Sequence, residues 1–164
     1  MVGVMLKAAI KAVELQFSGV KHLPTSQLAQ MLEAGDKPVA LWDCRTQAEF
    51  DVSHLPNAQW VSPDASAAEV AEKLSDVTSA DSIVCYCSAG YRSSSIAKLA
   101  QSVAGDKTQN IYNLQGSIFK WAEENRPMVD NLGRPTIFVH PYNSIFGKMI
   151  SAHLVKTDVS EIES

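Results

Sequence analysis

The stretch from residue 82 to residue 105 constrains the fold of this chain more than any other part of the sequence. It opens with an apolar, β-branched run at 82–86, which predicts a buried strand. A loop of small residues follows, and the segment 94–103 predicts a helix that ends at Gly105. Strands that lead through a short loop into a helix are the repeating unit of α/β folds, so we expect a parallel sheet covered by helices.

The rest of the chain repeats this alternation of strand-like and helix-like segments. The connections between the strands are too long for tight hairpins, which favours parallel pairing. We therefore predict an α/β fold, with helices on both faces of a parallel sheet. The other expected strands cover 20–23, 38–42, 59–61 and 110–114, and the other expected helices cover 6–17, 25–34, 67–74 and 116–124, with a short one starting at the capping box Thr46–Glu49.

The pattern changes after residue 126, which predicts a C-terminal extension. Residues 136–139 are expected to form a strand, and apolar residues between Tyr142 and Leu154 recur at helical spacing, which predicts a second amphipathic helix. The acidic tail at 156–164 is expected to fray. Three roles fit the aromatic side chains of the extension: wrapping the domain, homodimerisation, or covering the site. We divide the chain into an N-terminal amphipathic helix at 1–19, a core domain at 20–126 and the extension at 127–164.

The composition of the chain argues against several classes of function. A net charge of −4 and a pI near 5.5 disfavour nucleic acid and anionic membranes as partners, because both attract a basic face. Three cysteines among 164 residues do not suggest a disulfide framework, so we infer a reducing compartment. The apolar N-terminus is interrupted by Lys7, Lys11 and Glu14, which makes it a poor signal peptide. We therefore expect a cytoplasmic protein that binds neither nucleic acid nor membrane.

Cys87 is the candidate catalytic residue. It directly follows the strand at 82–86 and precedes a helix, so loop N–H groups and the helix N-terminus can both surround its sulfur. Gly90 permits a backbone conformation that other residues avoid, and Arg92 adds a positive charge. All of these features stabilise a thiolate, the nucleophilic form of cysteine. The same N–H groups would bind a terminal sulfur or an oxyanion.

Each cysteine also has a purely structural alternative, since most free cysteines pack in the core. For Cys87, the strand–loop–helix context favours reactivity. Cys44 is interpreted as a small buried apolar residue, and Cys85 as a core residue on the same strand face as Cys87. A resolving role for Cys85, attacking a persulfide on Cys87 to form a disulfide, is a subsidiary hypothesis. The Cys85–Cys87 pair has no further ligands at metal-binding spacing, so no metal site is predicted.

Three motifs resemble the signatures of rhodanese domains. The N-terminal signature is similar to LWDCR at 41–45, followed by Glu49 and Phe50 and by HLPNA at 54–58. The active-site loop of the family resembles CSAGYRS at 87–93, and its C-terminal signature resembles NLQG at 113–116 with the following Trp121. The motifs occur in the family's order and spacing between about residues 20 and 126. The chain therefore resembles a single-domain, rhodanese-like sulfurtransferase with a parallel α/β fold.

The resemblance implies sulfur-transfer chemistry. A donor such as thiosulfate or 3-mercaptopyruvate would pass its sulfane sulfur to Cys87, and cyanide or a thiol, including a protein thiol, would remove it from the persulfide. No cofactor is implied. Asp43 and Arg45 follow a neighbouring strand and are expected to support the site through charge-assisted hydrogen bonds at the same sheet edge. The implied substrate-binding residues are Ser88, Ala89, Gly90, Tyr91 and Arg92.

Two other functions stay open. The rhodanese fold can serve as a non-catalytic binding or regulatory module, although the presence of Cys87, Gly90 and Arg92 argues against that role here. Related phosphatases and arsenate reductases resemble C-x5-R, whereas four residues separate Cys87 from Arg92, which favours sulfur over a tetrahedral oxyanion. Ser117 stands where the family often has a second glycine, and His54 is expected to be a structural histidine.

Overall fold

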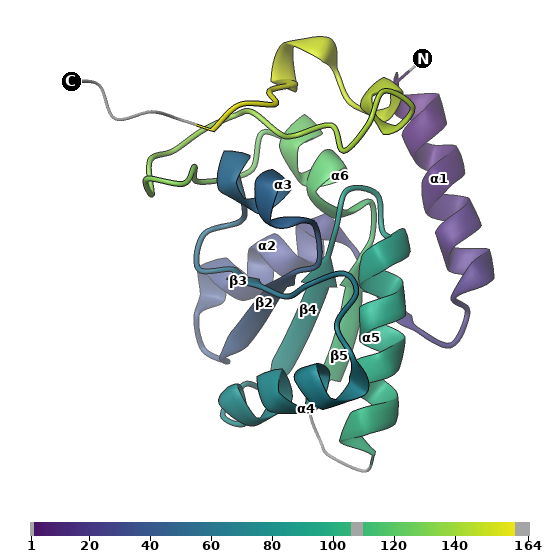
Figure 1. Ribbon diagram of the computed structural model, residues 1–164, viewed down its shortest axis with the longest axis vertical. Coiled ribbons are helices and arrows are strands. Elements are labelled where there is room, and N and C mark those ends of the chain that lie inside the picture. Colours follow the sequence, from purple (N-terminus) through teal and green to yellow (C-terminus); the bar gives the residue numbers. More distant parts are fainter. Residues whose placement is uncertain (1, 106–109, 160–164) are drawn as a thin grey trace.

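A five-stranded parallel sheet forms the centre of the molecule (Figure 1). The computed structural model describes residues 2–105 and 110–159. The strand order is β1-β5-β4-β2-β3, so the strand that precedes Cys87 lies in the middle of the sheet. The predicted α/β architecture is confirmed. The strands are β1 (Lys21–Leu23), β2 (Val39–Asp43), β3 (Gln59–Trp60), β4 (Ser82–Tyr86) and β5 (Asn110–Leu114).

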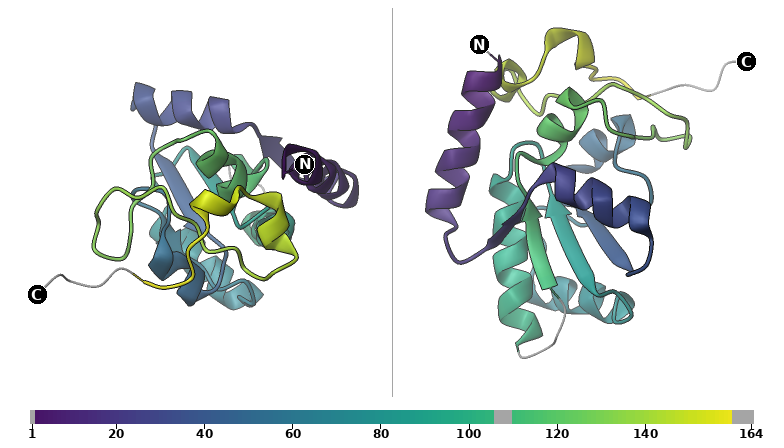
Figure 2. Two further views of the ribbon diagram at one scale, coloured as in Figure 1. Left: turned by 90° about the horizontal axis from the view of Figure 1, so that it is seen from above. Right: turned by 180° about the vertical axis from the view of Figure 1, so that it is seen from behind.

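Helices cover both faces of the sheet, as predicted (Figures 1 and 2). On one face, α4 (Ala67–Asp76) and α5 (Tyr91–Ala104) bury their apolar residues against Ile83 and Cys85 of β4. On the other face, α2 (Thr25–Ala34) and α6 (Ser117–Glu123) pack with Val84 and Tyr86. Alternate residues of a strand point to opposite faces, so the continuous apolar run of β4 supplies both cores.

Local capping signals set several helix ends. α3 (Gln47–Val52) begins at the predicted capping box, in which Thr46 Oγ1 accepts from the Glu49 N–H. α2 ends at Gly35, which adopts the left-handed conformation with φ 61°. α5 begins three residues before the predicted start at Ser94, because Gly90, with φ 123°, ends the loop early. Arg92 therefore belongs to the first turn of α5.

The N-terminal helix α1 (Val2–Gln16) stands beside α5 and the sheet (Figure 1). Its buried face carries Leu6, Ala9 and Val13, which recur at helical spacing. Its outer face exposes Val4 and Leu15. No helix in the described part of the chain is both long enough and apolar enough to cross a bilayer.

The extension differs from the prediction in its secondary structure. The amphipathic helix expected from Tyr142 to Leu154 is wrong, because this stretch holds two short 3-10 helices, η1 (Phe146–Met149) and η2 (Ala152–Leu154). Side chains form hydrogen bonds with backbone N–H groups that a long helix would use. Asn143 Oδ1, for example, accepts from the Phe146 N–H at 2.8 Å. Ser151 donates both its N–H and its hydroxyl to the carboxylate of Glu123.

The strand expected at 136–139 is also wrong. Only isolated bridges occur nearby, between Val129 and Pro135 and between Val139 and Val155. A proline has no N–H to continue a ladder, which is why no strand propagates from Pro135.

The extension wraps over one end of the domain, above α6 and beside the start of α1 (Figures 1 and 2). Its apolar residues Met128, Val139, Ile150 and Leu154 are buried in the same cluster as Phe119 of α6. Of the predicted acidic tail, residues 160–164 lie outside the described residues. The proposed division of the chain at residues 19 and 126 stays a prediction.

Candidate active site

Cys87 lies at the carboxyl edge of the sheet, between the end of β4 and the start of α5. β2 is the neighbour of β4, and their last paired residues are Asp43 and Tyr86. The next residue, Cys44, continues the contact, because its N–H donates to Tyr86 O at 2.8 Å. The residues that follow both strands therefore meet at one edge of the sheet. This arrangement brings Asp43 and Arg45 to the same edge as Cys87, as the parallel topology predicts.

The sulfur of Cys87 receives polar contacts from its own loop and from α5. The Gly90 N–H donates to Sγ at 3.1 Å, and Ser93 Oγ lies 3.3 Å from Sγ. Gly90 also allows close packing, because a Cβ there would lie 3.3 Å from Asn113 Nδ2 and 3.4 Å from Val13 Cγ1. Cys87 is only 2% exposed. The sulfur is therefore enclosed by its own loop and the start of α5, and Val13 of α1 packs close to Gly90.

The backbone of the loop is held by the start of α6. Ser117 Oγ accepts from the Cys87 N–H at 3.2 Å and donates to Leu114 O at 3.1 Å. The N–H groups of Ile118 and Phe119 donate at 3.1 Å to the carbonyls of Cys87 and Ser88. Ser117 adopts φ 50°, a conformation that a glycine would reach without strain, and the residue is fully buried. The serine found in place of a second glycine thus supplies a hydroxyl that holds the backbone of Cys87.

Glu49 is the main site residue that the sequence analysis missed. Its carboxylate accepts from Arg92 Nη1 at 2.8 Å, from Arg92 Nη2 at 2.9 Å and from Ser88 Oγ at 3.1 Å. The same carboxylate accepts from the N–H and hydroxyl of Thr46. The capping box explained the glutamate by its contacts to Thr46 alone, and nothing in the local sequence pointed to the loop 39 residues away. Glu49 therefore ties α3 both to the loop after Cys87 and to the first turn of α5.

The charges of this pair shape the electrostatics of the site. Burial alone would raise the pKa of Glu49, but the hydrogen bonds and charge of Arg92, with help from Thr46, lower it to about 2. Burial opposes the charge on Arg92, yet Glu49 and Cys87 raise its pKa above the usual value. The guanidinium also lies 4.1 Å from the ring centroid of Tyr142, in the extension. Arg92 therefore contacts α3, the loop and the extension at the same time.

Asp43 and Arg45 form a second, fully buried ion pair. Arg45 donates from Nη2 to Asp43 Oδ2 at 2.6 Å and from Nε to Oδ1 at 2.9 Å. Nη2 of Arg45 also donates to Ser53 O at 2.6 Å, which fixes the turn after α3. Next to the pair, Tyr86 accepts at its hydroxyl from the Leu55 N–H at 3.0 Å, and burial and Asp43 raise the pKa of Tyr86. The contacts of this pair reach the turn rather than the sulfur.

Two further cysteines, two histidines and Tyr91 also belong to this part of the molecule. Cys44 and Cys85 are fully buried, and burial together with a hydrogen bond to Cys85 raises the pKa of Cys44, which suppresses its nucleophilicity. His54 stacks on Phe50 at 3.8 Å between ring centroids and shares a 2.9 Å hydrogen bond between Nδ1 and Phe50 O. Burial lowers the pKa of His140, and the nearby charges that act on it include that of Glu49. Tyr91 is half-buried at the start of α5.

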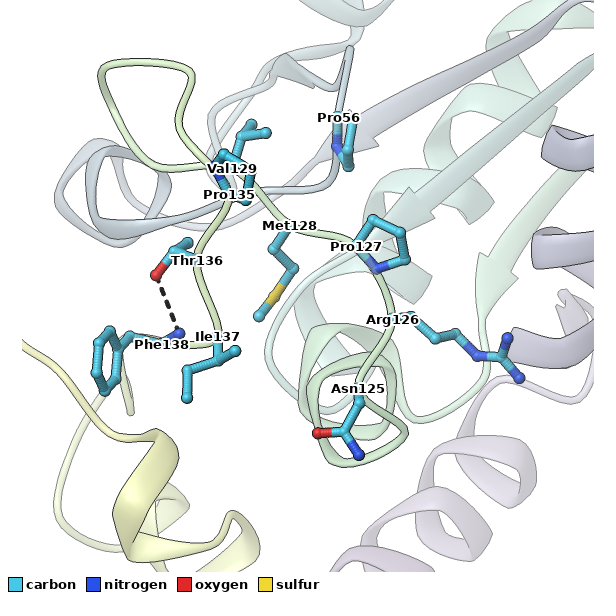
Figure 3. A pocket seen from close by; sticks show the side chains of 10 residues that line it. All are labelled: Pro56, Asn125, Arg126, Pro127, Met128, Val129, Pro135, Thr136, Ile137 and Phe138. Carbon is cyan, nitrogen blue, oxygen red and sulfur yellow. Dashed lines mark hydrogen bonds between the residues drawn. The ribbon is translucent and has the colours of Figure 1, made fainter.

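A concave region that none of residues 87–92 lines is shown in Figure 3. It is a shallow hollow of about 620 Å³, lined by Pro56 and by residues 125–129 and 135–138. Met128 and Ile137 face it, while the side chain of Arg126 points away and pairs with Glu124. Its apolar lining offers no catalytic group. Across residues 2–105 and 110–159, no three His, Cys, Asp or Glu side chains are arranged to hold a metal ion.

Comparisons with known proteins place this geometry in a family. The model of the rhodanese-like domain matches residues 24–124, more than half of the chain. A thiosulfate sulfurtransferase from Pseudomonas aeruginosa is similar in structure, with 18% identity and a TM-score of 0.57; the match covers 76% of this chain but 23% of that protein. A comparison with curated protein sequences gave no match.

Two smaller proteins share the fold over most of their length. A rhodanese-like domain protein from Staphylococcus aureus is 22% identical, with a TM-score of 0.50 and coverage of 62% of this chain and 91% of that one. RPA3614 from Rhodopseudomonas palustris, described as a protein of unknown function and possible tyrosine phosphatase, is 21% identical, with a TM-score of 0.53 and coverage of 74% and 92%. At such identities, these likenesses speak for the fold alone.

Proposed function

The chain belongs to the rhodanese-like domain family, and on that premise we propose that it is a sulfurtransferase with Cys87 as its nucleophile. The observation that carries the proposal is the 3.1 Å hydrogen bond from the Gly90 N–H to Cys87 Sγ, at the point where β4 passes into α5. This N–H and the N-terminus of α5 favour negative charge on sulfur. The short loop between Cys87 and Arg92 suits a sulfur atom better than a tetrahedral phosphoryl group.

The proposed reaction has two covalent steps. The Cys87 thiolate attacks the outer sulfur of thiosulfate, a new S–S bond forms, the S–S bond of the donor breaks, and sulfite leaves with the bonding electron pair. The anionic persulfide then gives its terminal sulfur to cyanide, which yields thiocyanate and restores the thiolate. A thiol acceptor would react at the same sulfur, and 3-mercaptopyruvate is an alternative donor. In this scheme Ser88, Ala89, Gly90, Tyr91 and Arg92 form the donor-binding loop, while Asp43 and Arg45 support it.

One observation favours a non-catalytic binding module instead. Cys87 is 2% exposed, so a donor reaches the sulfur only if its cover moves. Val13 of α1, which packs next to Gly90, and Tyr142 of the extension, which lies over Arg92, both contact residues of the Cys87 loop or of the turn that follows it. Sulfur loading of the protein decides between the two functions.

The test is incubation with thiosulfate or 3-mercaptopyruvate, followed by intact mass and by thiocyanate formation with cyanide. We expect a gain of one sulfur atom, located on Cys87, and complete loss of loading and turnover in Cys87→Ser. Cys85→Ala is the matched control, because Cys85 lies in β4, two residues before Cys87, and is also buried. A protein that gains no sulfur would be a binding module, and hydrolysis of an aryl phosphate would point to a phosphatase.

A further inference from the structure

A chain of hydrogen bonds links the sulfur of Cys87 to a histidine on the edge strand of the sheet. Ser93 Oγ lies 3.3 Å from Cys87 Sγ and 2.6 Å from Asn113 Oδ1. Asn113 Nδ2 lies 3.0 Å from Nδ1 of His22, and Nε2 of His22 lies 3.0 Å from Phe17 O. The four contacts run from α5 through β5 to β1 and the turn before it. None of these partners is explained by the sulfur-transfer steps.

The carbonyl at the far end fixes the direction of every bond in this chain. Phe17 O can only accept, so Nε2 of His22 carries a proton and Nδ1 of the neutral ring is an acceptor. Asn113 must then donate from Nδ2 to His22 and offer Oδ1 to Ser93. The single hydroxyl proton of Ser93 goes to Oδ1, and Ser93 presents a lone pair to the sulfur. That lone pair accepts a hydrogen bond from the thiol form of Cys87 and repels the thiolate form.

We propose that His22, acting through Asn113, sets the direction of the Ser93 hydroxyl and thereby couples ionisation of Cys87 to protonation of His22. When His22 gains a proton, Nδ1 also becomes a donor, so Asn113 turns its amide and accepts from His22 with Oδ1. Its Nδ2 group then donates to Ser93 Oγ, and the hydroxyl proton of Ser93 turns to the sulfur.

The proton balance of the coupled change is simple. Cys87 releases its thiol proton to solvent and His22 takes one up, so the sum is a thiolate and an imidazolium with no change in net charge. A persulfide anion on Cys87 would be stabilised in the same way. His22 is thus a positioning residue. The inference deepens the proposed function, since it concerns the thiol that would receive the sulfur.

Burial and register make this coupling effective. Ser93 is fully buried and Asn113 is 1% exposed, so the part of the chain next to the sulfur is shielded from water, whereas His22 is half-buried. His22 and Asn113 face each other in the register of β1 and β5. Glu14 of α1 accepts from Gln115, and Lys21 donates to Asn110. The other ionisable groups on the elements packed around His22 are Lys7 and Lys11 of α1, Tyr112 of β5, and Tyr91, Arg92 and Lys98 of α5.

The first test reads the protonation of the His22 ring directly. Two-bond proton–nitrogen correlations of the ring at pH 8 are expected to show the proton on Nε2 and an accepting Nδ1. A proton on Nδ1 of the neutral ring would overturn the proposal, because Asn113 would then face the opposite way.

The second test measures the rate of Cys87 alkylation by iodoacetamide from pH 5 to pH 9, with the label located by peptide mass. We expect the curves of the natural protein and His22→Leu to cross. At low pH the natural protein should react faster, because only it has the imidazolium that turns the Ser93 hydroxyl proton toward the sulfur. At high pH it should react more slowly, because only in it does the neutral His22 ring hold the Ser93 lone pair toward the thiolate. Each difference should be roughly two- to tenfold, the range that one hydrogen bond contributes.

Three variants complete the design. In a Ser93→Ala background, His22→Leu should leave the profile unchanged, because the hydroxyl that carries the coupling is gone. His22→Gln, which is polar but takes up no proton, should lose the low-pH advantage, and it serves if His22→Leu fails to fold. Lys21→Ala, at the exposed neighbouring position on β1, should keep the natural profile.

A constant ratio between the curves of the natural protein and His22→Leu, or an effect of His22→Leu that persists without Ser93, would overturn the coupling. Alkylation needs no sulfur donor. Failure of persulfide loading would therefore refute the proposed function while leaving this result standing, and the reverse also holds.

Discussion

The segment 87–92, which runs from Cys87 through its loop into the first turn of α5, and the extension at 127–159 are held in place by different forces. The loop is short and polar, and α3, α5 and α6 all hydrogen bond to it, with the pair Glu49–Arg92 at its centre. The extension is long and irregular, and buried apolar side chains such as Val139 and Ile150 attach it to the domain. The two regions meet where Tyr142 lies over Arg92, 4.1 Å from ring centroid to guanidinium.

This difference predicts how each region responds to change. A buried polar group that loses its partner costs the full free energy of desolvation, so the loop should fail at single polar substitutions. An apolar attachment loses free energy in proportion to the area removed, so the extension should weaken in smaller steps. Mutations in the two regions therefore test whether polar contacts hold one and apolar burial holds the other.

The largest effect is expected for Glu49→Gln. The amide cannot neutralise Arg92, and its NH2 group opposes the donors of Arg92, Ser88 or Thr46. We expect the free energy of unfolding to fall by about 3–4 kcal/mol, measured by urea denaturation, together with loss of sulfur loading. Gln47→Ala, at an exposed position on the same helix, is the control. A loss below about 1 kcal/mol for Glu49→Gln would show that the loop does not depend on this pair.

Acid should act on the same carboxylate. The pKa of Glu49 is lowered from 4.5 to about 2, so the stability it contributes is complete above pH 4.5 and is lost as the pH falls toward 2. Allowing for the partial exposure of Arg92, the loss amounts to roughly 2–3 kcal/mol. Urea midpoints at pH 5 and pH 3 measure a little over half of this loss, about 1–2 kcal/mol, because the pKa of Glu49 in the folded protein lies below pH 3. An equal loss in Glu49→Gln would assign the acid sensitivity to other groups.

In the extension, Val139→Ala should cost about 2 kcal/mol. Val139 is fully buried, so the substitution removes two methyl groups from the shared core and leaves a cavity. Ile137→Ala, two residues away and 54% exposed in the natural protein, should change the free energy of unfolding by less than about 0.5 kcal/mol. Equal effects of the two substitutions in urea denaturation would mean that the extension is not anchored through Val139.

The smallest effect is expected where the two regions touch. Tyr142→Leu removes the ring above Arg92 and should cost about 0.5–1 kcal/mol, whereas Tyr142→Phe keeps the ring and should be nearly neutral. A double-mutant cycle of Tyr142→Leu with Arg92→Lys measures the coupling. Additive effects would mean that the extension covers the loop without supporting it.

Local signals were enough to predict most of the fold. The apolar run of β4 reads as a buried strand because both of its faces are covered, and the Thr46–Glu49 capping box starts α3 where expected. The order of the loop after β4 predicted that Cys87 would stand at the carboxyl edge of the sheet. These features depend on residues close together in the chain, so their physical causes are visible in the sequence.

The predicted helix at 142–154 shows the limit of periodicity. Apolar residues recur there at helical spacing, yet Glu123 of α6 binds Ser151 and Asn143 turns back on its own backbone. The apolar side chains are buried all the same, from an irregular backbone. The apolar spacing therefore predicted which residues face the core, but not their backbone conformation, which depends on contacts with a helix distant in the sequence.

Short-range patterns and ordered motifs encode the parallel sheet, the place of Cys87 at its edge and the family to which the chain belongs, so all three are visible in the sequence. The surroundings of the sulfur depend instead on how distant elements pack. Glu49, Ser117, Asn113 and His22 come from four different elements, and each looks locally like a cap, a turn or a strand residue. Their joint placement follows from packing those elements at one end of the sheet, where buried polar groups must find partners far along the chain.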